Sequence, residues 1–125
     1  MPLDEETIAR LARSRTVDLV TTGRRSGRPR RVEIWWFQFE ERFIVTGTPG
    51  PRDWYANVLA NPAVVIETRH GDFPGRARVV TDPRFRRRFF ADRKTLWYST
   101  QSDLEALVKT APMIEIDLHQ EAQER

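Results

Sequence analysis

A strongly basic stretch, residues 21–31 (Thr-Thr-Gly-Arg-Arg-Ser-Gly-Arg-Pro-Arg-Arg), lies between an apolar run and the most aromatic run of the chain. The apolar run covers residues 17–20, and the aromatic run covers residues 32–39. Gly23 and Gly27 can adopt positive φ values at no steric cost, as a tight turn requires. The stretch therefore predicts a strand, a glycine-containing turn and a second strand, which commits the chain to a β-sheet.

The predicted turn and the start of the second strand contain five arginines and no acidic residue. Closely spaced like charges repel one another, so an anion bound there would relieve the repulsion. The planar guanidinium fork, free backbone N–H groups and the hydroxyl of Ser26 all suit phosphate or carboxylate oxygens. The alternative is a solvated basic hairpin, because the whole chain uses 19 arginines and only two lysines.

The rest of the chain predicts four further short strands, six in all, and four short helices. The further strands are expected at residues 43–46, 63–68, 76–80 and 113–118, with residues 71–75 as a turn. The last of these strands should alternate, with Met113, Glu115 and Asp117 on one side and Ile114, Ile116 and Leu118 on the other. Helices are expected at residues 4–13, from Pro51 to residue 60, after an Asp82 cap, and from a capping box at residues 102–105 to before Pro112. In the third helix, Phe85 and Phe89 should face inward while residues 86–88, all arginines, point outward.

These elements suggest a mainly β, α+β fold: one domain over residues 1–125, built as a split or closed antiparallel barrel of about six strands flanked by short helices. An N-terminal helix and a frayed tail from His119 would flank it. Four tryptophans and seven phenylalanines in so short a chain favour a homodimer, because large aromatics often extend into a subunit interface.

Several kinds of chemistry are disfavoured. The chain has no cysteine, and His70 and His119 have no second ligand at metal spacing. Ser26 has no nucleophile-elbow context, and neither the P-loop nor the Rossmann glycine pattern is present. A net charge of +3 argues against nucleic acid, and no apolar run is long enough for a signal peptide or a membrane span, so a cytoplasmic protein is expected. What remains is a protein whose cofactor supplies the reactivity.

Two ordered motifs resemble the deazaflavin-dependent nitroreductase family. They are the basic stretch itself and the later segment of residues 53–62, Asp-Trp-Tyr-x-Asn-x-x-x-Asn-Pro, which follows a Gly-Thr-Pro-Gly loop. This family is part of the flavin-binding split-barrel superfamily of pyridoxamine 5'-phosphate oxidase. The resemblance runs from about residue 17 to residue 67.

The resemblance implies a homodimer that binds coenzyme F-420, a deazaflavin with a phosphodiester and a polyglutamate tail. It implies that the phosphate-binding turn consists of Arg24, Arg25, Ser26, Gly27 and Arg30. It also implies that Thr48 and Gly50 approach the ring and its linker, that Trp54 and Asn57 close over the cofactor, and that Trp35 lies beside the substrate. Charge alone adds Arg31 and Arg52 to this set.

The expected function is an oxidoreductase that passes a hydride from the reduced deazaflavin to a small conjugated acceptor: a quinone, an enone or a nitro compound. Thr48 is the candidate donor to developing negative charge, and Tyr98 is the candidate proton donor. FMN remains the alternative cofactor, since Pro49 stands where similar proteins often have a lysine. The alternative functions are an FMN-dependent oxidase or flavin reductase and a non-catalytic cofactor-binding protein.

Overall fold

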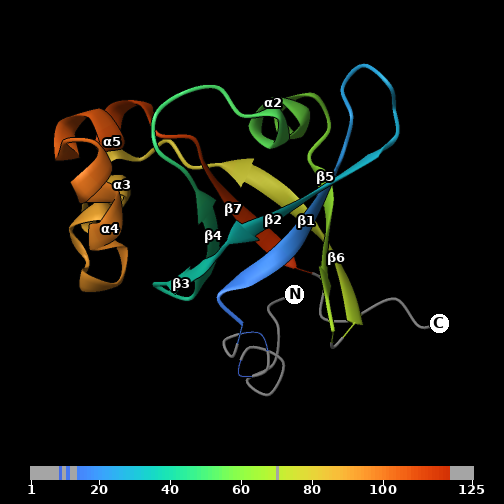
Figure 1. Cartoon of the computed structure of the whole chain (residues 1–125), viewed down its shortest axis with the longest axis horizontal. Helices are drawn as coiled ribbons and strands as arrows, with labels where there is room; N and C mark the ends of the chain where they lie inside the picture. Colours follow the sequence, from blue (N-terminus) through green and yellow to red (C-terminus); the bar gives the residue numbers. More distant parts are fainter. Residues whose placement is uncertain (1–8, 10, 12–13, 70, 119–125) are drawn as a thin grey trace.

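The computed structural model describes residues 9, 11, 14–69 and 71–118. Its centre is one curled, fully antiparallel sheet of seven strands in the order β2-β1-β5-β6-β7-β4-β3 (Figure 1). The strands are β1 Thr16–Thr22, β2 Pro29–Trp35, β3 Phe37–Phe39, β4 Arg42–Thr46, β5 Ala63–Thr68, β6 Gly71–Val79 and β7 Met113–Leu118. The helices are α2 Asp53–Ala60, α3 Pro83–Ala91, η1 Arg93–Thr95, α4 Leu96–Gln101 and α5 Leu104–Thr110. The predicted split barrel is confirmed, with seven strands in place of about six.

The main core fills the concave side of the sheet. Alternate residues of β1 point into it, so Val17 and Leu19 are buried while their neighbours are half-exposed. Helix α2 closes one side of this core with Trp54 and Val58 (Figure 1). The sequence pattern that predicted a hairpin thus also determines which β1 side chains face the interior.

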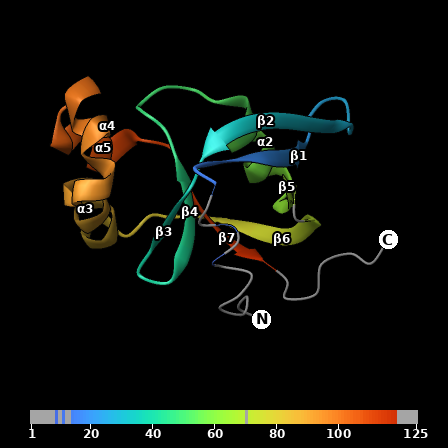
Figure 2. The same ribbon diagram turned by 60° about the horizontal axis from the view of Figure 1, so that its bottom comes forward.

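A second core lies between β4, β7 and the helices α3 to α5, which gather at one end of the sheet (Figure 2). Phe85, Phe89 and Phe90 of α3 are at most 1% exposed. The predicted alternation of β7 is confirmed, and both of its faces are used at its start, since Met113 belongs to this second core and Ile114 to the first. The inward direction of Phe85 and Phe89 is also confirmed.

The predicted second strand is divided at Trp36. Its ring stacks on Phe43 with centroids 4.3 Å apart, and its indole N–H donates to the carbonyl of Ser14 at 2.8 Å. These contacts turn Trp36 into the main core, while Trp35 is 37% exposed. The two tryptophans therefore face opposite sides, and the prediction of one continuous strand through the aromatic run of residues 32–39 is wrong.

The predicted turn at residues 71–75 is also wrong, because these residues form the first half of β6. Pro74 pairs with Val65 of β5, and pairing with β7 begins only at Gly75. Among the described residues, the missing N–H of the proline therefore falls where β6 pairs with β5 alone, and a strand tolerates proline at such a position.

Arg86 contradicts the expectation that all three arginines of α3 point outward, because it is only 6% exposed. Its guanidinium donates to four backbone carbonyls, those of Val80, Leu107, Val108 and Ala111. Three of these carbonyls lie at or near the C-terminal end of α5, where unpaired carbonyls accumulate partial negative charge. Arg87 and Arg88 do point outward and form ion pairs with Glu105 and Glu40.

Smaller differences concern helix boundaries. Helix α2 begins at Asp53 and not at Pro51, and Asp103, not Ser102, caps α5 by accepting from the N–H of Ala106. The Asp82 cap is confirmed, since its carboxylate accepts from Arg84 N at 2.9 Å. Helix α4 was not predicted. Most of the expected helix at residues 4–13 and the tail from His119 lie outside the described residues.

Candidate functional site

The basic turn between β1 and β2 is a compact loop held by its own hydrogen bonds. Gly23 N donates to Arg28 O and Gly27 N donates to Gly23 O, both at 2.8 Å. Gly27 has the predicted positive φ of 71°. Gly23 has no positive φ; a Cβ there would lie 2.6 Å from Ser26 Oγ and 3.2 Å from Arg28 O, so a larger residue would displace the Ser26 hydroxyl. The loop backbone is therefore fixed before any ligand binds.

A cavity of about 770 Å³ lies between this turn, the adjoining ends of β1 and β2, and helix α2. The residues that line it are Thr21, Gly23, Arg24, Arg25, Ser26, Pro29, Arg30, Arg31, Val32, Asp53, Trp54 and Asn57. Two sequence motifs more than twenty residues apart thus meet at one site. The volume falls in the range of a cofactor-sized pocket.

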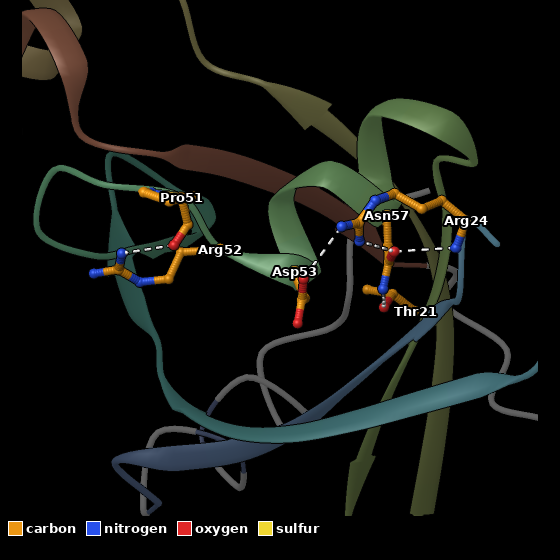
Figure 3. Close-up of polar contacts among 6 residues, drawn as sticks. All are labelled: Thr21, Arg24, Pro51, Arg52, Asp53 and Asn57. Carbon is orange, nitrogen blue, oxygen red and sulfur yellow. Dashed lines mark hydrogen bonds and ion pairs between the residues drawn. The ribbon is translucent and has the colours of Figure 1, made fainter. Parts of the chain in front are cut away.

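Asn57 joins the two motifs. Its side chain is 2% exposed, and its Oδ1 accepts hydrogen bonds from Arg24 N at 3.1 Å and Arg24 Nη1 at 2.9 Å. Its Nδ2 donates to Thr21 Oγ1 at 3.0 Å, as Figure 3 shows. Both polar atoms of the amide therefore have protein partners.

The cavity lining contains four arginines and one carboxylate. Asp53 Oδ1 lies 3.3 Å from Arg24 Nη2, and its side chain is 90% exposed. Glu67, outside the lining, binds Arg31 at 2.7 Å, and this hydrogen bond raises the pKa of the Arg31 guanidinium above its ordinary value. Within the described part of the chain, Arg25 and Arg30 form no ion pair. Their charge is therefore available to an anionic ligand.

The loop that carries Thr48 and Gly50 is organised by Arg52. Arg52 Nη2 donates to Thr48 O and Thr48 Oγ1, both at 3.0 Å, and Nη1 donates to Pro51 O at 3.1 Å. In Figure 3 the guanidinium of Arg52 points away from Asp53 and Asn57. Arg52 therefore holds the loop and does not line the cavity at the basic turn.

A separate group of aromatic rings lies at the end of β2. Trp35 contacts Trp97 and Tyr98 edge-to-face, with centroids 5.4 and 6.5 Å apart. Both tryptophans are partly exposed, at 37% and 49%, whereas Tyr98 is 3% exposed. Burial raises the pKa of Tyr98 to about 12, so its hydroxyl stays protonated at neutral pH.

The structure thus brings most of the predicted cofactor-binding residues into one cavity: Arg24, Arg25, Ser26, Arg30, Arg31, Trp54 and Asn57. The other predicted site residues lie outside its lining: Gly27, Trp35, Thr48, Gly50 and Tyr98. Five further residues line it that were not predicted as site residues: Thr21, Gly23, Pro29, Val32 and Asp53. The alternation of buried residues in β1 places Thr21 on the same face as Leu19, and Asp53 lies one helical turn before Asn57.

Two further observations restrict the site. No group of three histidine, cysteine or acidic side chains capable of holding a metal occurs in the described residues. The helices of the described segments also lack the length and apolar character needed to cross a bilayer.

Comparison with known proteins identifies the family to which this sequence is similar. A sequence model of the F420H(2)-dependent quinone reductase family matches residues 4–116. Among solved structures, an F420-H2 dependent reductase (FDR-A) superposes with a TM-score of 0.61 at 22% identity, over 82% of this chain and 94% of that one. The conserved hypothetical protein Rv2991 from Mycobacterium tuberculosis has a TM-score of 0.67 at 17% identity, with 94% and 81% covered. The haem storage protein HutZ from Vibrio cholerae has a TM-score of 0.56 at 19% identity, with 97% and 93% covered. These structures share the fold of this chain.

Proposed function

The chain belongs to the F420H(2)-dependent quinone reductase family, and on this basis we propose that it passes a hydride from reduced coenzyme F-420 to a quinone. It is a deazaflavin-dependent oxidoreductase, as its sequence led us to expect. The FMN-dependent alternative is not favoured, because the family that matches nearly the whole chain uses the deazaflavin.

The observation that supports the cofactor site is the excess of positive charge that the arginines give to the cavity lining. Four guanidinium groups line it against the single carboxylate of Asp53, and Arg25 and Arg30 have no ion-pair partner among the described residues. Guanidinium groups bind phosphate oxygens through paired, charge-assisted hydrogen bonds. The residues present therefore fit a cofactor that carries a phosphodiester and acidic groups.

In this proposal the phosphodiester is held by Arg24, Arg25, Ser26, Arg30 and Arg31, and Gly27 gives the turn the positive φ that it needs. Trp54 supplies an apolar wall, and Gly50 allows the loop backbone to approach the cofactor. Asn57 is buried and engaged with Arg24, so its contribution is to orient that arginine. When bound, the reduced deazaflavin supplies the hydride.

The remaining roles concern the acceptor. Thr48 Oγ1 accepts a hydrogen bond from the cationic Arg52, which leaves its own hydroxyl proton free to donate to an oxygen that gains negative charge. The partly exposed rings of Trp35 and Trp97 offer apolar surface against which a quinone can pack. Tyr98, protonated at neutral pH and packed against both rings, is the candidate proton donor.

A homodimer and a cytoplasmic location belong to the same proposal. Every residue of β2 except Ile34 is exposed, and this edge strand carries Val32 and Trp35, each 37% exposed. A structural neighbour with a TM-score of 0.63 at 20% identity is described as a domain-swapped dimer. A partner copy over β2 would bury these side chains. Analytical ultracentrifugation of the purified protein tests this part.

The direct test of the activity is oxidation of reduced coenzyme F-420, followed by its absorbance, when a soluble quinone is added. We expect turnover that depends on both the protein and the quinone. Enone and nitro acceptors, tested in parallel, establish the range of the acceptor. Quinone reduction with reduced FMN but not with reduced coenzyme F-420 would overturn the proposal.

A further inference from the structure

The direction of each hydrogen bond between Arg24, Asn57 and Thr21 can be assigned. Arg24 offers only donors to Asn57, namely its backbone N–H and Nη1, so the atom that they contact must be the amide oxygen. The amide nitrogen then faces Thr21 and donates to its Oγ1 at 3.0 Å. The cationic arginine therefore fixes the orientation of the amide.

This assignment makes Thr21 Oγ1 an acceptor toward Asn57 and leaves the hydroxyl proton of Thr21 uncommitted. In residues 14–69 and 71–118 the hydroxyl of Thr21 donates to no protein atom, and the whole residue is only 3% exposed. Thr21 also lines the cavity at the basic turn. A buried hydroxyl donor normally has an acceptor, and a ligand in the cavity supplies one.

We propose that Thr21 is a further ligand-binding residue, whose hydroxyl donates a hydrogen bond to an anionic oxygen of the cofactor, of the phosphate or carboxylate class. The inference rests on the proposed function, because it assumes that the cavity holds the acidic part of the cofactor. It adds a neutral donor from the buried face of β1 to the arginines of the turn. Thr21 Oγ1 accepts a hydrogen bond from Asn57, which in turn accepts from Arg24. This chain of hydrogen bonds polarises the Thr21 hydroxyl and strengthens it as a donor to a ligand oxygen.

The test compares Thr21→Val with Thr21→Ser. Valine has nearly the shape of threonine but no hydroxyl, whereas serine keeps the hydroxyl. Two probes are titrated against each variant: coenzyme F-420, followed by its fluorescence, and inorganic phosphate, followed by calorimetry. We expect Thr21→Val to raise both dissociation constants roughly tenfold, and Thr21→Ser to stay within about twofold of the unmodified protein, since a hydrogen bond to a charged group has an effect of this size.

Thr95→Val is the matched control for stability. Thr95 is 1% exposed, and its hydroxyl donates to the carbonyls of Phe89 and Asp92 in the helical layer, outside the cavity lining. This variant should melt at a lower temperature and bind both probes like the unmodified protein. If Thr21→Val melts lower but keeps full affinity for both probes, Thr21 is structural only and the inference is wrong.

Thr21→Val also removes the acceptor of Asn57 Nδ2 and can thereby displace Arg24. The substitution is therefore repeated in an Arg24→Ala background, as a double-mutant cycle. A direct contact predicts that Thr21→Val still weakens phosphate binding there. If the effect disappears, Thr21 acts only through Arg24 and the inference is overturned.

The two probes separate this inference from the proposed function. Loss of phosphate affinity in Thr21→Val supports the inference, even for a protein that does not bind coenzyme F-420. Normal affinity of Thr21→Val for both probes overturns the inference and leaves the proposed function unaffected.

Discussion

Asn57 Oδ1 accepts two hydrogen bonds from the same residue, Arg24, at 3.1 Å from its backbone nitrogen and 2.9 Å from Nη1. This pair attaches helix α2 to the basic turn, although the two residues lie 33 positions apart. The arginine is thus oriented from a buried site before any anion arrives. Such preorganisation lowers the entropy cost of binding.

The first prediction follows from this pair. Asn57→Ala should lower the free energy of unfolding by about 1–3 kcal/mol, because Thr21 and the Arg24 backbone N–H lose buried partners. It should also weaken coenzyme F-420 binding, because Arg24 is no longer held. Asn61→Ala is the control: Asn61 is exposed, and its Oδ1 accepts from Ala63 N at 3.1 Å, outside the cavity lining. Denaturant unfolding and fluorescence titration measure the two effects, and equal coenzyme affinity in both variants would refute the proposed role of Asn57.

Arg86 should be a major determinant of stability. Arg86→Met removes a donor from four buried carbonyls, of which that of Leu107 also accepts from Ala111 N, so we expect a loss of about 3 kcal/mol in denaturant unfolding. Burial lowers the pKa of the Arg86 guanidinium, because it disfavours the charged form. The four carbonyls stabilise that charged form. Arg87, on the same helix as Arg86, forms an exposed ion pair with Glu105 of α5, and Arg87→Met should change the stability little. Similar effects of the two substitutions would contradict the structural role of Arg86.

Tyr98 makes stability depend on pH in the alkaline range. Its folded pKa of about 12 lies above that of an unfolded tyrosine, roughly 10. The stabilisation is therefore complete below about pH 10 and is lost as the pH rises towards 12, by about 2 kcal/mol. Unfolding measured across this range should show a steeper loss for the unmodified protein than for Tyr98→Phe. Parallel curves would show that Tyr98 ionises normally in the folded protein.

The same substitution tests the chemistry. If Tyr98 is the proton donor, Tyr98→Phe should lower kcat for quinone reduction while leaving coenzyme binding unchanged. An unchanged kcat would assign Tyr98 to packing alone.

The Trp35–Trp97 pair should bind the acceptor and not the coenzyme. Trp97→Ala removes an exposed ring that contacts Trp35 at 5.4 Å, and we expect a higher KM for the quinone with unchanged affinity for coenzyme F-420. Leu59→Ala is a suitable control, because Leu59 is 62% exposed and lies on α2, outside this aromatic pair. Steady-state kinetics with varied quinone measures the effect. A KM equal to that of Leu59→Ala would exclude the pair from acceptor binding.

Local patterns predicted the parts of the fold that depend on nearby residues. The alternation of β7, the Asp82 cap and the inward direction of Phe85 and Phe89 each follow from spacing along one element. The division of the second strand did not, because it results from contacts of Trp36 with Phe43 and Ser14 in other parts of the fold. The burial of Arg86 is similar, since its partners are carbonyls that only the folded helices bring together.

The candidate site divides in the same way. The arginines of the turn could be identified from charge and from the family motif, and they do line one cavity. The role of Asn57 could not be predicted from the sequence. Its place in the motif does not reveal that its Oδ1 and Nδ2 are hydrogen-bonded to Arg24 and Thr21. Thr21 was part of the quoted motif, but the sequence does not tell that its side chain faces the cavity. That orientation depends on the register between β1 and β2, in which Thr21 pairs with Arg30.

The most direct test of the central claim is a fluorescence titration with coenzyme F-420 and with FMN, for the unmodified protein and for an Arg25→Glu/Arg30→Glu variant. These two arginines have no ion-pair partner in the described residues, so reversing their charge should leave the fold intact. We predict binding of coenzyme F-420 in preference to FMN, and its loss in the variant while the melting temperature stays nearly constant. Undiminished coenzyme binding by the variant, or binding of FMN alone by the unmodified protein, would contradict the assignment of this cavity.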